Sequence, residues 1–127
     1  MNINERSRNT AKILIDIGAI NFSLMTPFKL SSGFLSPSYI DCRKIIAYPL
    51  AFKSITDMMI DTIKSDMDPQ SPDYIIGGET AGIPFGAVIA EKMGLPLSYV
   101  RKKAKGYGKN KLIEGDILKE RNSLLVE

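Results

Sequence analysis

Two stretches of the chain carry apolar residues at the three- and four-residue spacing of an amphipathic helix. The first predicts a helix from about Glu5 to Ile20. The second begins at Pro49, which suits the first turn of a helix because proline lacks an N–H group, and predicts a helix to about Asp66. The apolar positions are Ile13, Leu14, Ile17 and Ile20 in the first stretch, and Phe52, Ile55, Met59 and Ile63 in the second.

Between these helices the apolar period shortens to two, as in a strand. Phe28 and Leu30 alternate with polar neighbours, and the sequence Ser-Ser-Gly at 31–33 is typical of a turn. Residues 39–42 predict a second short strand, so residues 22–43 predict a small antiparallel ribbon. In that strand we expect Cys42 to be a small residue facing the core rather than a nucleophile.

Further along, the patterns follow the order strand, glycine-rich loop, helix, strand. The apolar run 74–76 is of the kind buried in a parallel sheet. Residues 77–82 predict a tight loop. A helix is expected from Pro84 to Met93 with Gly94 as its stop, and residues 97–100 predict the next strand. This βαβ unit predicts an α/β fold with a parallel sheet and a right-handed crossover.

The remaining segments are shorter. Residues 68–72 and the Lys- and Gly-rich residues 102–110 predict loops, the second of them mobile. Residues 112–113 predict a further strand, residues 115–116 a turn, and residues 123–127 the start of another buried strand.

Composition narrows the class of protein. A chain of 127 residues with 44% hydrophobic and 24% charged residues can bury one core. Its polar start lacks the apolar stretch of a signal peptide, and no run is long enough to span a bilayer. The single cysteine suits a reducing cytoplasm. Histidine is absent, which excludes Ser-His-Asp and Cys-His catalysis and argues against structural zinc.

The positive charge is concentrated in one segment. Six cations and no acid lie between Arg101 and Lys111, although the net charge is only +3. Without acids nearby, these cations are expected to lack local partners and to favour a polyanion, either a nucleic acid or a small phosphorylated ligand. Arg101 follows a strand closely enough to be held for bidentate phosphate binding, and Gly106 and Gly108 supply hinges. A solvated basic loop is the alternative.

Two further segments could contact a ligand. The loop Gly-Glu-Thr-Ala-Gly-Ile-Pro, residues 78–84, opens a helix whose first amides favour a phosphate, yet it matches neither the dinucleotide fingerprint nor the Walker A pattern. A tight turn without a ligand fits it equally well. Ser31, Ser32 and Tyr39 could line a flat pocket, although an ordinary strand pair explains them too.

The order of these segments resembles orotate phosphoribosyltransferase. An F-x-L-x-S-G hairpin ending in Y-I-D, a helix, a G-x-E-T-A-G-I-P loop and V-R-K-x-x-K-G-Y-G occur in this sequence between about Ile13 and Glu127. The resemblance implies a type I phosphoribosyltransferase-like α/β fold: a parallel sheet flanked by helices, with a small N-terminal antiparallel hairpin subdomain. One incomplete domain is expected over residues 1–127, with a helix and hairpin hood at 1–45 and the start of the core at 46–127.

The family transfers ribose 5-phosphate from 5-phosphoribosyl diphosphate to orotate, with magnesium carried by the diphosphate. The resemblance implies that Lys105 neutralises the leaving group, as the catalytic position, and that a set of residues contacts orotate: Tyr39, Ile40 and Ser31. A larger set is expected to contact 5-phosphoribosyl diphosphate: Arg101, Lys102, Lys105, Tyr107, Glu79, Thr80, Ala81, Lys29 and Glu127. The loop 102–110 would close over the site and reach a neighbouring subunit, which implies a homodimer in the cytoplasm.

The resemblance also carries departures. Many relatives have lysine where this chain has Ser31, and others have histidine at the position of Tyr107. Family members continue past the strand at 124–126 into a second acid and a Thr/Gly-rich loop that cradles the ribose 5-phosphate. We therefore expect the C-terminal part of the core to be missing, little or no transferase activity from the isolated chain, and an unpaired apolar sheet edge.

Three hypotheses follow. The chain is the N-terminal part of a phosphoribosyltransferase, which could pair with a separately encoded C-terminal portion. It is a nucleic-acid-binding module, against which stands the lack of interleaved aromatic residues. Or it is a non-catalytic remnant that only dimerises.

Overall fold

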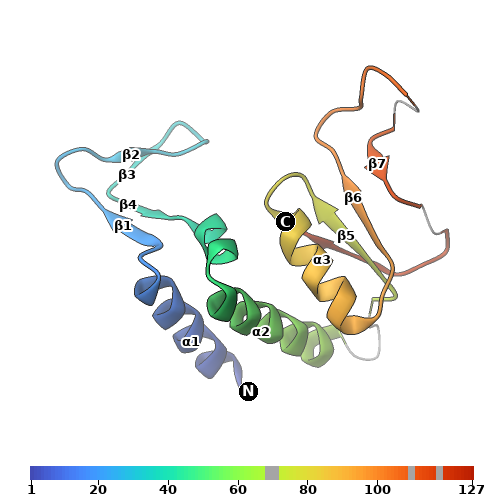
Figure 1. Ribbon diagram of the computed structural model, residues 1–127. Coiled ribbons are helices and arrows are strands. Elements are labelled where there is room, and N and C mark those ends of the chain that lie inside the picture. The colour runs from blue at the N-terminus through green and yellow to red at the C-terminus, as the bar shows by residue number, and fades with distance from the viewer. Residues whose placement is uncertain (68–71, 109–110, 117–118) are drawn as a thin grey trace. The chain divides into compact units, whose positions relative to one another are not determined.

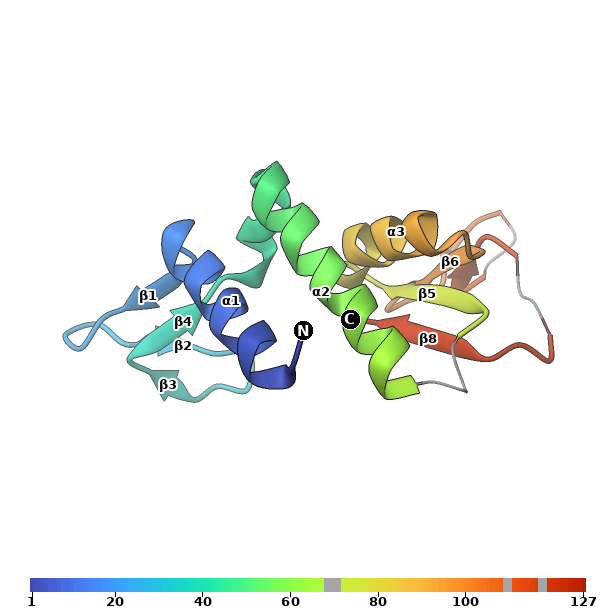
Figure 2. The same cartoon turned by 90° about the horizontal axis from the view of Figure 1, so that it is seen from below.

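The computed structural model describes residues 1–67, 72–108, 111–116 and 119–127. The chain divides into two compact units, Met1–Ile55 and Thr56–Glu127. The division lies within helix α2 (Pro49–Met67), whose bounds agree with the helix that the sequence predicts at Pro49 to about Asp66. Together, Figures 1 and 2 label the helices α1–α3 and the strands along the chain. The loop expected at 68–72 falls almost entirely outside the described residues.

The first unit opens with helix α1 (Ile3–Asp16). Asn2 caps it: its side chain accepts a hydrogen bond from the Glu5 amide, and the Glu5 carboxylate accepts one from the Asn2 amide, each at 3.0 Å. The prediction that this helix reaches Ile20 is wrong. Gly18 adopts a left-handed conformation with φ +64°, and the chain then enters a strand at Ile20.

Two short antiparallel strand pairs follow in the same unit. Strand β1 (Ile20–Phe22) pairs with β4 (Ser38–Ile40), and β2 (Phe28–Lys29) pairs with β3 (Leu35–Ser36). The predicted antiparallel strands are confirmed, but the strand that ends at Ile40 pairs with β1 and not with the strand at 28–29.

Cys42 differs from its prediction. Strand β4 ends at Ile40, and Cys42 begins the 3₁₀ helix η1 (Cys42–Ala47) instead of continuing the strand. The thiol is exposed, so the expectation that it faces the core is wrong.

The second unit is built on a sheet whose described strands have the order β7-β6-β5-β8. The central strand β5 (Tyr74–Gly78) runs parallel to β6 (Leu97–Val100) and to β8 (Ser123–Val126), while β7 (Ile113–Glu114) is antiparallel to β6. Helix α3 (Gly82–Met93) connects β5 to β6 and covers one face of the sheet (Figure 2). The predicted βαβ unit with a parallel sheet is confirmed. Gly94 ends α3 with φ +65°, as predicted.

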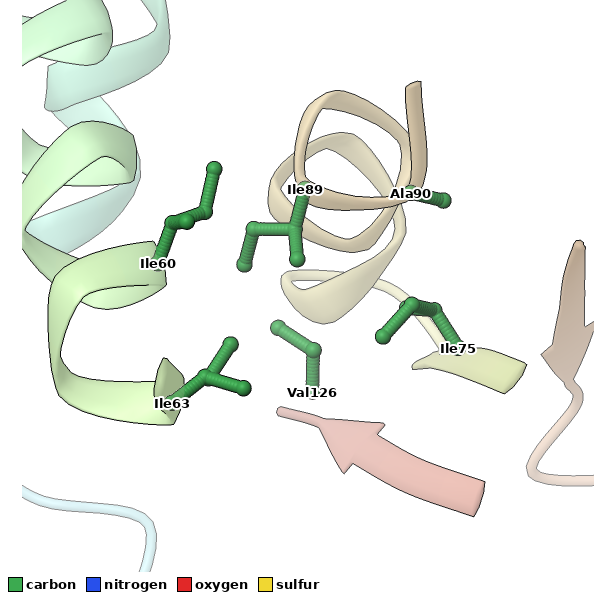
Figure 3. Packing of buried hydrophobic residues seen from close by; sticks show 6 residues of the cluster. All are labelled: Ile60, Ile63, Ile75, Ile89, Ala90 and Val126. Carbon is green, nitrogen blue, oxygen red and sulfur yellow. The ribbon is translucent and has the colours of Figure 1, made fainter. Parts of the chain in front are cut away.

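The core of this unit lies between α2, α3 and the sheet. Ile60 and Ile63 of α2 point toward Ile89 of α3 and Val126 of β8 (Figure 3). Ile75, the second residue of β5, and Ile89 have no exposed surface. Burying aliphatic side chains of this size is the main favourable term in folding.

One glycine allows α3 to approach β8 closely. A Cβ atom built on Gly82 would lie 1.9 Å from the carbonyl oxygen of Val126, so a larger residue would collide with backbone. The start of α3 and the end of β8 are therefore in direct contact.

Strand β8 is an edge strand of the described sheet. Leu125 on it is 54% exposed, and an apolar cavity of about 340 Å³ lies beside it, lined by Met59, Thr62, Ile63, Ile89, Leu124, Leu125, Val126 and Glu127.

Candidate functional site

The ends of β5 and β6 place two predicted ligand segments beside each other. Gly78 pairs with Val100 in the parallel register, so the loop that follows β5 and the basic loop (residues 102–110) start from neighbouring positions. The Glu79 amide donates to the Val100 carbonyl at 2.9 Å. In return, the Lys102 amide donates to Glu79 Oε2 at 2.7 Å. The carboxyl ends of parallel strands are the usual ligand-binding edge of such sheets.

The end of β8 lies at the same edge. A Cβ atom on Gly78 would be 3.7 Å from Cγ of Glu127, which places this carboxylate side chain beside the 78–82 loop. Helix α3 begins there, and at Ala81 no side chain among the described residues caps it. In its first turn the Ile83 amide donates to the Thr80 carbonyl at 3.4 Å and Pro84 has no N–H group, so at most the Gly82 amide is left for an anion. Thr80 is exposed, and Ala81 is half-buried.

Arg101 and Lys105 share one carboxylate oxygen. Arg101 Nε lies 3.1 Å and Lys105 Nζ 2.6 Å from Oε1 of Glu114. The hydrogen bond from Lys105 is the main cause that holds the pKa of Glu114 below its usual value, opposed by desolvation and supported by Arg101. The expectation that the basic cluster has no local acid is therefore wrong.

The described part of the basic loop forms one wall of a cavity of about 230 Å³. Tyr107 projects there with 78% of its surface exposed. The lining residues are Lys105, Tyr107, Gly108, Lys111, Ile113, Glu114 and Gly115. Residues 102–108 are neither helix nor strand, as the sequence predicts, and residues 109–110 lie outside the described part of the chain.

The predicted orotate residues belong to the first unit. Tyr39 lies on β4, 37% exposed, with its ring centroid 5.8 Å from that of Phe28 on β2. Ile40, at the end of β4, is half exposed. Lys29, on β2, and Ser31, in the turn that follows it, are exposed to solvent. The strand pairs hold these four residues on one small hairpin subdomain.

Two properties of the described residues bear on ligands and location. They contain no group of three or more Asp, Glu or Cys side chains that could hold a metal ion. Nor, within the same ranges, is there a helix long and apolar enough to cross a membrane.

Glu114 is the site residue that the sequence reasoning missed. The predicted strand at 112–113 stops one residue short of it, whereas β7 includes Glu114 opposite Tyr99. Extending the strand by one residue and pairing it with β6 would have placed this carboxylate beside Arg101.

Comparison with known proteins gives the fold class. The chain superposes on orotate phosphoribosyltransferase from Aeropyrum pernix with a TM-score of 0.68 and 34% identity, covering 84% of this chain and 57% of that one. Leishmania donovani UMP synthase matches with a TM-score of 0.68 and 30% identity over 92% of this chain and 24% of its own. The fold is thus that of the type I phosphoribosyltransferases, with part of the core present.

Within that class the chain resembles orotate phosphoribosyltransferase along nearly all of its length. It is 50% identical over 123 residues to the orotate phosphoribosyltransferase of Cereibacter sphaeroides, covering 97% of this chain and 53% of the relative. The chain therefore spans about half the length of the curated relatives it matches. No family model matches the sequence.

Proposed function

We propose that the chain forms part of an orotate phosphoribosyltransferase, which transfers ribose 5-phosphate from 5-phosphoribosyl diphosphate to orotate. The observation that carries the proposal is the hydrogen bond from the Lys102 amide to the Glu79 carboxylate. It joins the loop at 78–84, after β5, to the basic loop. Similarity to orotate phosphoribosyltransferases at 50% identity gives the proposal its reaction. Both units would belong to one incomplete domain, and the remaining half of the site would come from polypeptide outside these 127 residues.

The cations after β6 suit the diphosphate of the donor. Arg101 stands at the strand end, where a guanidinium can bind two phosphate oxygens at once. Lys105 lines the adjoining cavity and is the group that we assign to neutralise the departing diphosphate. The ammonium group of Lys102 and the phenol of Tyr107 would also contact the diphosphate.

The loop after β5 would face the same diphosphate. Thr80 offers a hydroxyl, and the Gly82 amide at the start of α3, after Ala81, offers partial positive charge. Glu79 fixes the neighbouring loop by accepting the Lys102 amide. Glu127, beside Gly78, would accept from the ribose hydroxyls, and Lys29 would add a charge from the first unit.

The hairpin subdomain would cover the orotate ring. Tyr39 presents an aromatic face that is supported by Phe28, and Ile40 extends the apolar surface. Ser31 supplies a hydroxyl for the polar edge of the ring. A flat heterocycle with polar substituents suits this mixture of aromatic and polar groups.

Magnesium would enter with the diphosphate. As the resemblance to orotate phosphoribosyltransferase implies, phosphate oxygens would be its main ligands. Bound there, the ion supplies neutralisation of the diphosphate charge.

The proposal also covers the cellular compartment and the assembly of the protein. We place it in the cytoplasm, since its one cysteine suits a reducing compartment. A homodimer would bring the basic loop to a neighbouring site. The edge strand β8 and its apolar cavity would receive further chain, either a continuation or a separate C-terminal portion.

Calorimetric titration with inorganic diphosphate and magnesium tests the proposal. Lys105→Gln should weaken binding by about tenfold, because it removes a charge-assisted contact of roughly 1.4 kcal/mol. Lys12→Gln, on α1 and with the same charge change, should bind like the wild-type chain. Equal affinity of the two variants, or no binding by the folded chain, would refute the proposal.

A further inference from the structure

The Glu114 carboxylate forms salt bridges with two cations, one next to a strand and one in an irregular loop. Both salt bridges end on Oε1, with Arg101 Nε at 3.1 Å and Lys105 Nζ at 2.6 Å. All three side chains are partly shielded, with 27–31% of their surfaces exposed. Shielding of this degree makes the interactions less sensitive to salt than those of fully exposed pairs.

The two cations differ in how firmly they are held. Arg101 directly follows β6, its amide donates to the Leu112 carbonyl at 2.7 Å, and its guanidinium lies 5.8 Å from the centre of the Tyr99 ring. Lys105 lies four residues farther on, in a segment that is neither helix nor strand. Its flexible four-carbon side chain can swing without moving the sheet, so Lys105 is the exchangeable partner and Arg101 the fixed one.

An anion in the adjoining cavity would compete for the same ammonium. The cavity of about 230 Å³ is lined by Lys105 and Lys111 as well as by the Glu114 side chain. A carboxylate carries one negative charge, whereas a diphosphate carries several and offers more acceptor oxygens. Lys105 would therefore gain more from such a ligand than it loses on leaving Glu114. Arg101 would keep its Nε on the carboxylate, which leaves the two terminal nitrogens of its guanidinium for phosphate oxygens.

We propose that Glu114 is a positioning residue that holds Lys105 against β7 while the site is empty and releases it to an entering diphosphate. The inference rests on the proposed function for the identity of the anion. Glu114 thereby opposes binding slightly, and it prevents the free ammonium from repelling the neighbouring cations of the loop. After Lys105 leaves, the same carboxylate keeps Arg101 oriented at the strand end.

The test compares Glu114→Gln with Asp116→Asn in the 127-residue chain. Both changes remove one negative charge from the same part of the chain. The described contacts of Asp116 use its backbone oxygen, which accepts from Tyr74 and Ser98 and which the substitution leaves in place. Circular dichroism confirms folding of each variant.

Two readouts separate this latch, meaning the holding and release of Lys105 by Glu114, from the proposed function. Acetylation of Lys105 without ligand, followed by mass spectrometry with Lys12 as internal reference, should rise several-fold in Glu114→Gln and stay unchanged in Asp116→Asn. Calorimetry with inorganic diphosphate and magnesium should show severalfold tighter binding by Glu114→Gln. In the Lys105→Gln background that gain should disappear, because the exchangeable partner is gone.

Each alternative outcome has a distinct meaning. Diphosphate binding with Lys105 equally reactive in wild-type and Glu114→Gln chains would overturn the latch and leave the proposed function standing. Increased Lys105 reactivity with no diphosphate binding by either chain would overturn the proposed function and, with it, the competition. Weaker binding by Glu114→Gln would also overturn the latch, because it would make Glu114 a support for the bound state.

Discussion

The Glu79 carboxylate accepts a hydrogen bond from the Lys102 amide at 2.7 Å. This contact joins two loops that are 23 residues apart in sequence. A carboxylate bonded to a backbone amide is a charge-assisted interaction, stronger than a neutral hydrogen bond. It fixes the first residue of the basic loop relative to the phosphate-type loop after β5.

Glu79→Ala should loosen the basic loop without unfolding the sheet. With the amide of Lys102 unpaired, trypsin should cleave after Lys102 and Lys103 faster than in the wild-type chain. The measurement is a digestion time course with mapping of the cut sites. Glu91→Ala, on the exposed surface of α3, is the matched control. Equal cleavage rates for both variants would show that the contact does not restrain the loop.

Gly82→Ala should destabilise the second unit by about 2 kcal/mol or more. The added Cβ would lie 1.9 Å from the Val126 carbonyl oxygen, so β8 or α3 must shift. Urea denaturation measures the change in the free energy of unfolding. Among the described residues no heavy atom comes within 4 Å of a Cβ built on Gly106, so Gly106→Ala should leave stability nearly unchanged. Equal midpoints for the two variants would contradict the close approach of α3 and β8.

Ile89→Ala should cost about 3 kcal/mol of stability. The side chain has no exposed surface and packs among the cluster of Figure 3, and truncation leaves a cavity there. Ile15→Ala, at a position 64% exposed on α1, should cost far less. Chemical denaturation of both variants gives the comparison, and similar losses would place the core elsewhere.

The Glu114 ion pairs should stabilise the fold only above acidic pH. The pKa of Glu114 lies below its ordinary value of 4.5, chiefly because of the Lys105 hydrogen bond. A lowered pKa means that the stabilisation is present in full above the unfolded-state value and is lost as the pH falls through the folded-state value. The gap in urea midpoint between wild-type and Glu114→Gln chains should therefore narrow as the pH drops below 4.5. A gap independent of pH would contradict the ion pairs.

Local patterns predicted the second unit better than the first. Between Tyr74 and Val100, glycines stand at the ends of the apolar runs. The spacing of apolar residues and the glycine positions therefore predict the same boundaries for the strands and the helix. The end of α1 was misplaced because Ile20 continues the helical spacing although its backbone belongs to a strand. At that point Gly18, not the apolar pattern, decides where the helix ends.

The candidate site was predicted in its segments but not in its internal contacts. Proximity of the 78–84 loop and the basic loop follows from a parallel sheet, which the sequence indicates. The Glu114 contact depends on the antiparallel pairing of β7 with β6, a register that the sequence between Val100 and Ile113 does not reveal. Cys42 shows the same limit, since the step from strand to 3₁₀ helix after Ile40 has no marker in the apolar pattern.

The central claim is that this chain contributes the diphosphate-binding and orotate-covering part of an orotate phosphoribosyltransferase. The direct measurement is orotidylate formation from orotate, 5-phosphoribosyl diphosphate and magnesium. The pure chain is assayed alone and with a polypeptide carrying the part of the Cereibacter sphaeroides relative that it does not match. We predict little or no product from the chain alone, product with the supplement, and loss of that product in Lys105→Gln. No product from the folded chain with its supplement, or equal product from Lys105→Gln, would contradict the account.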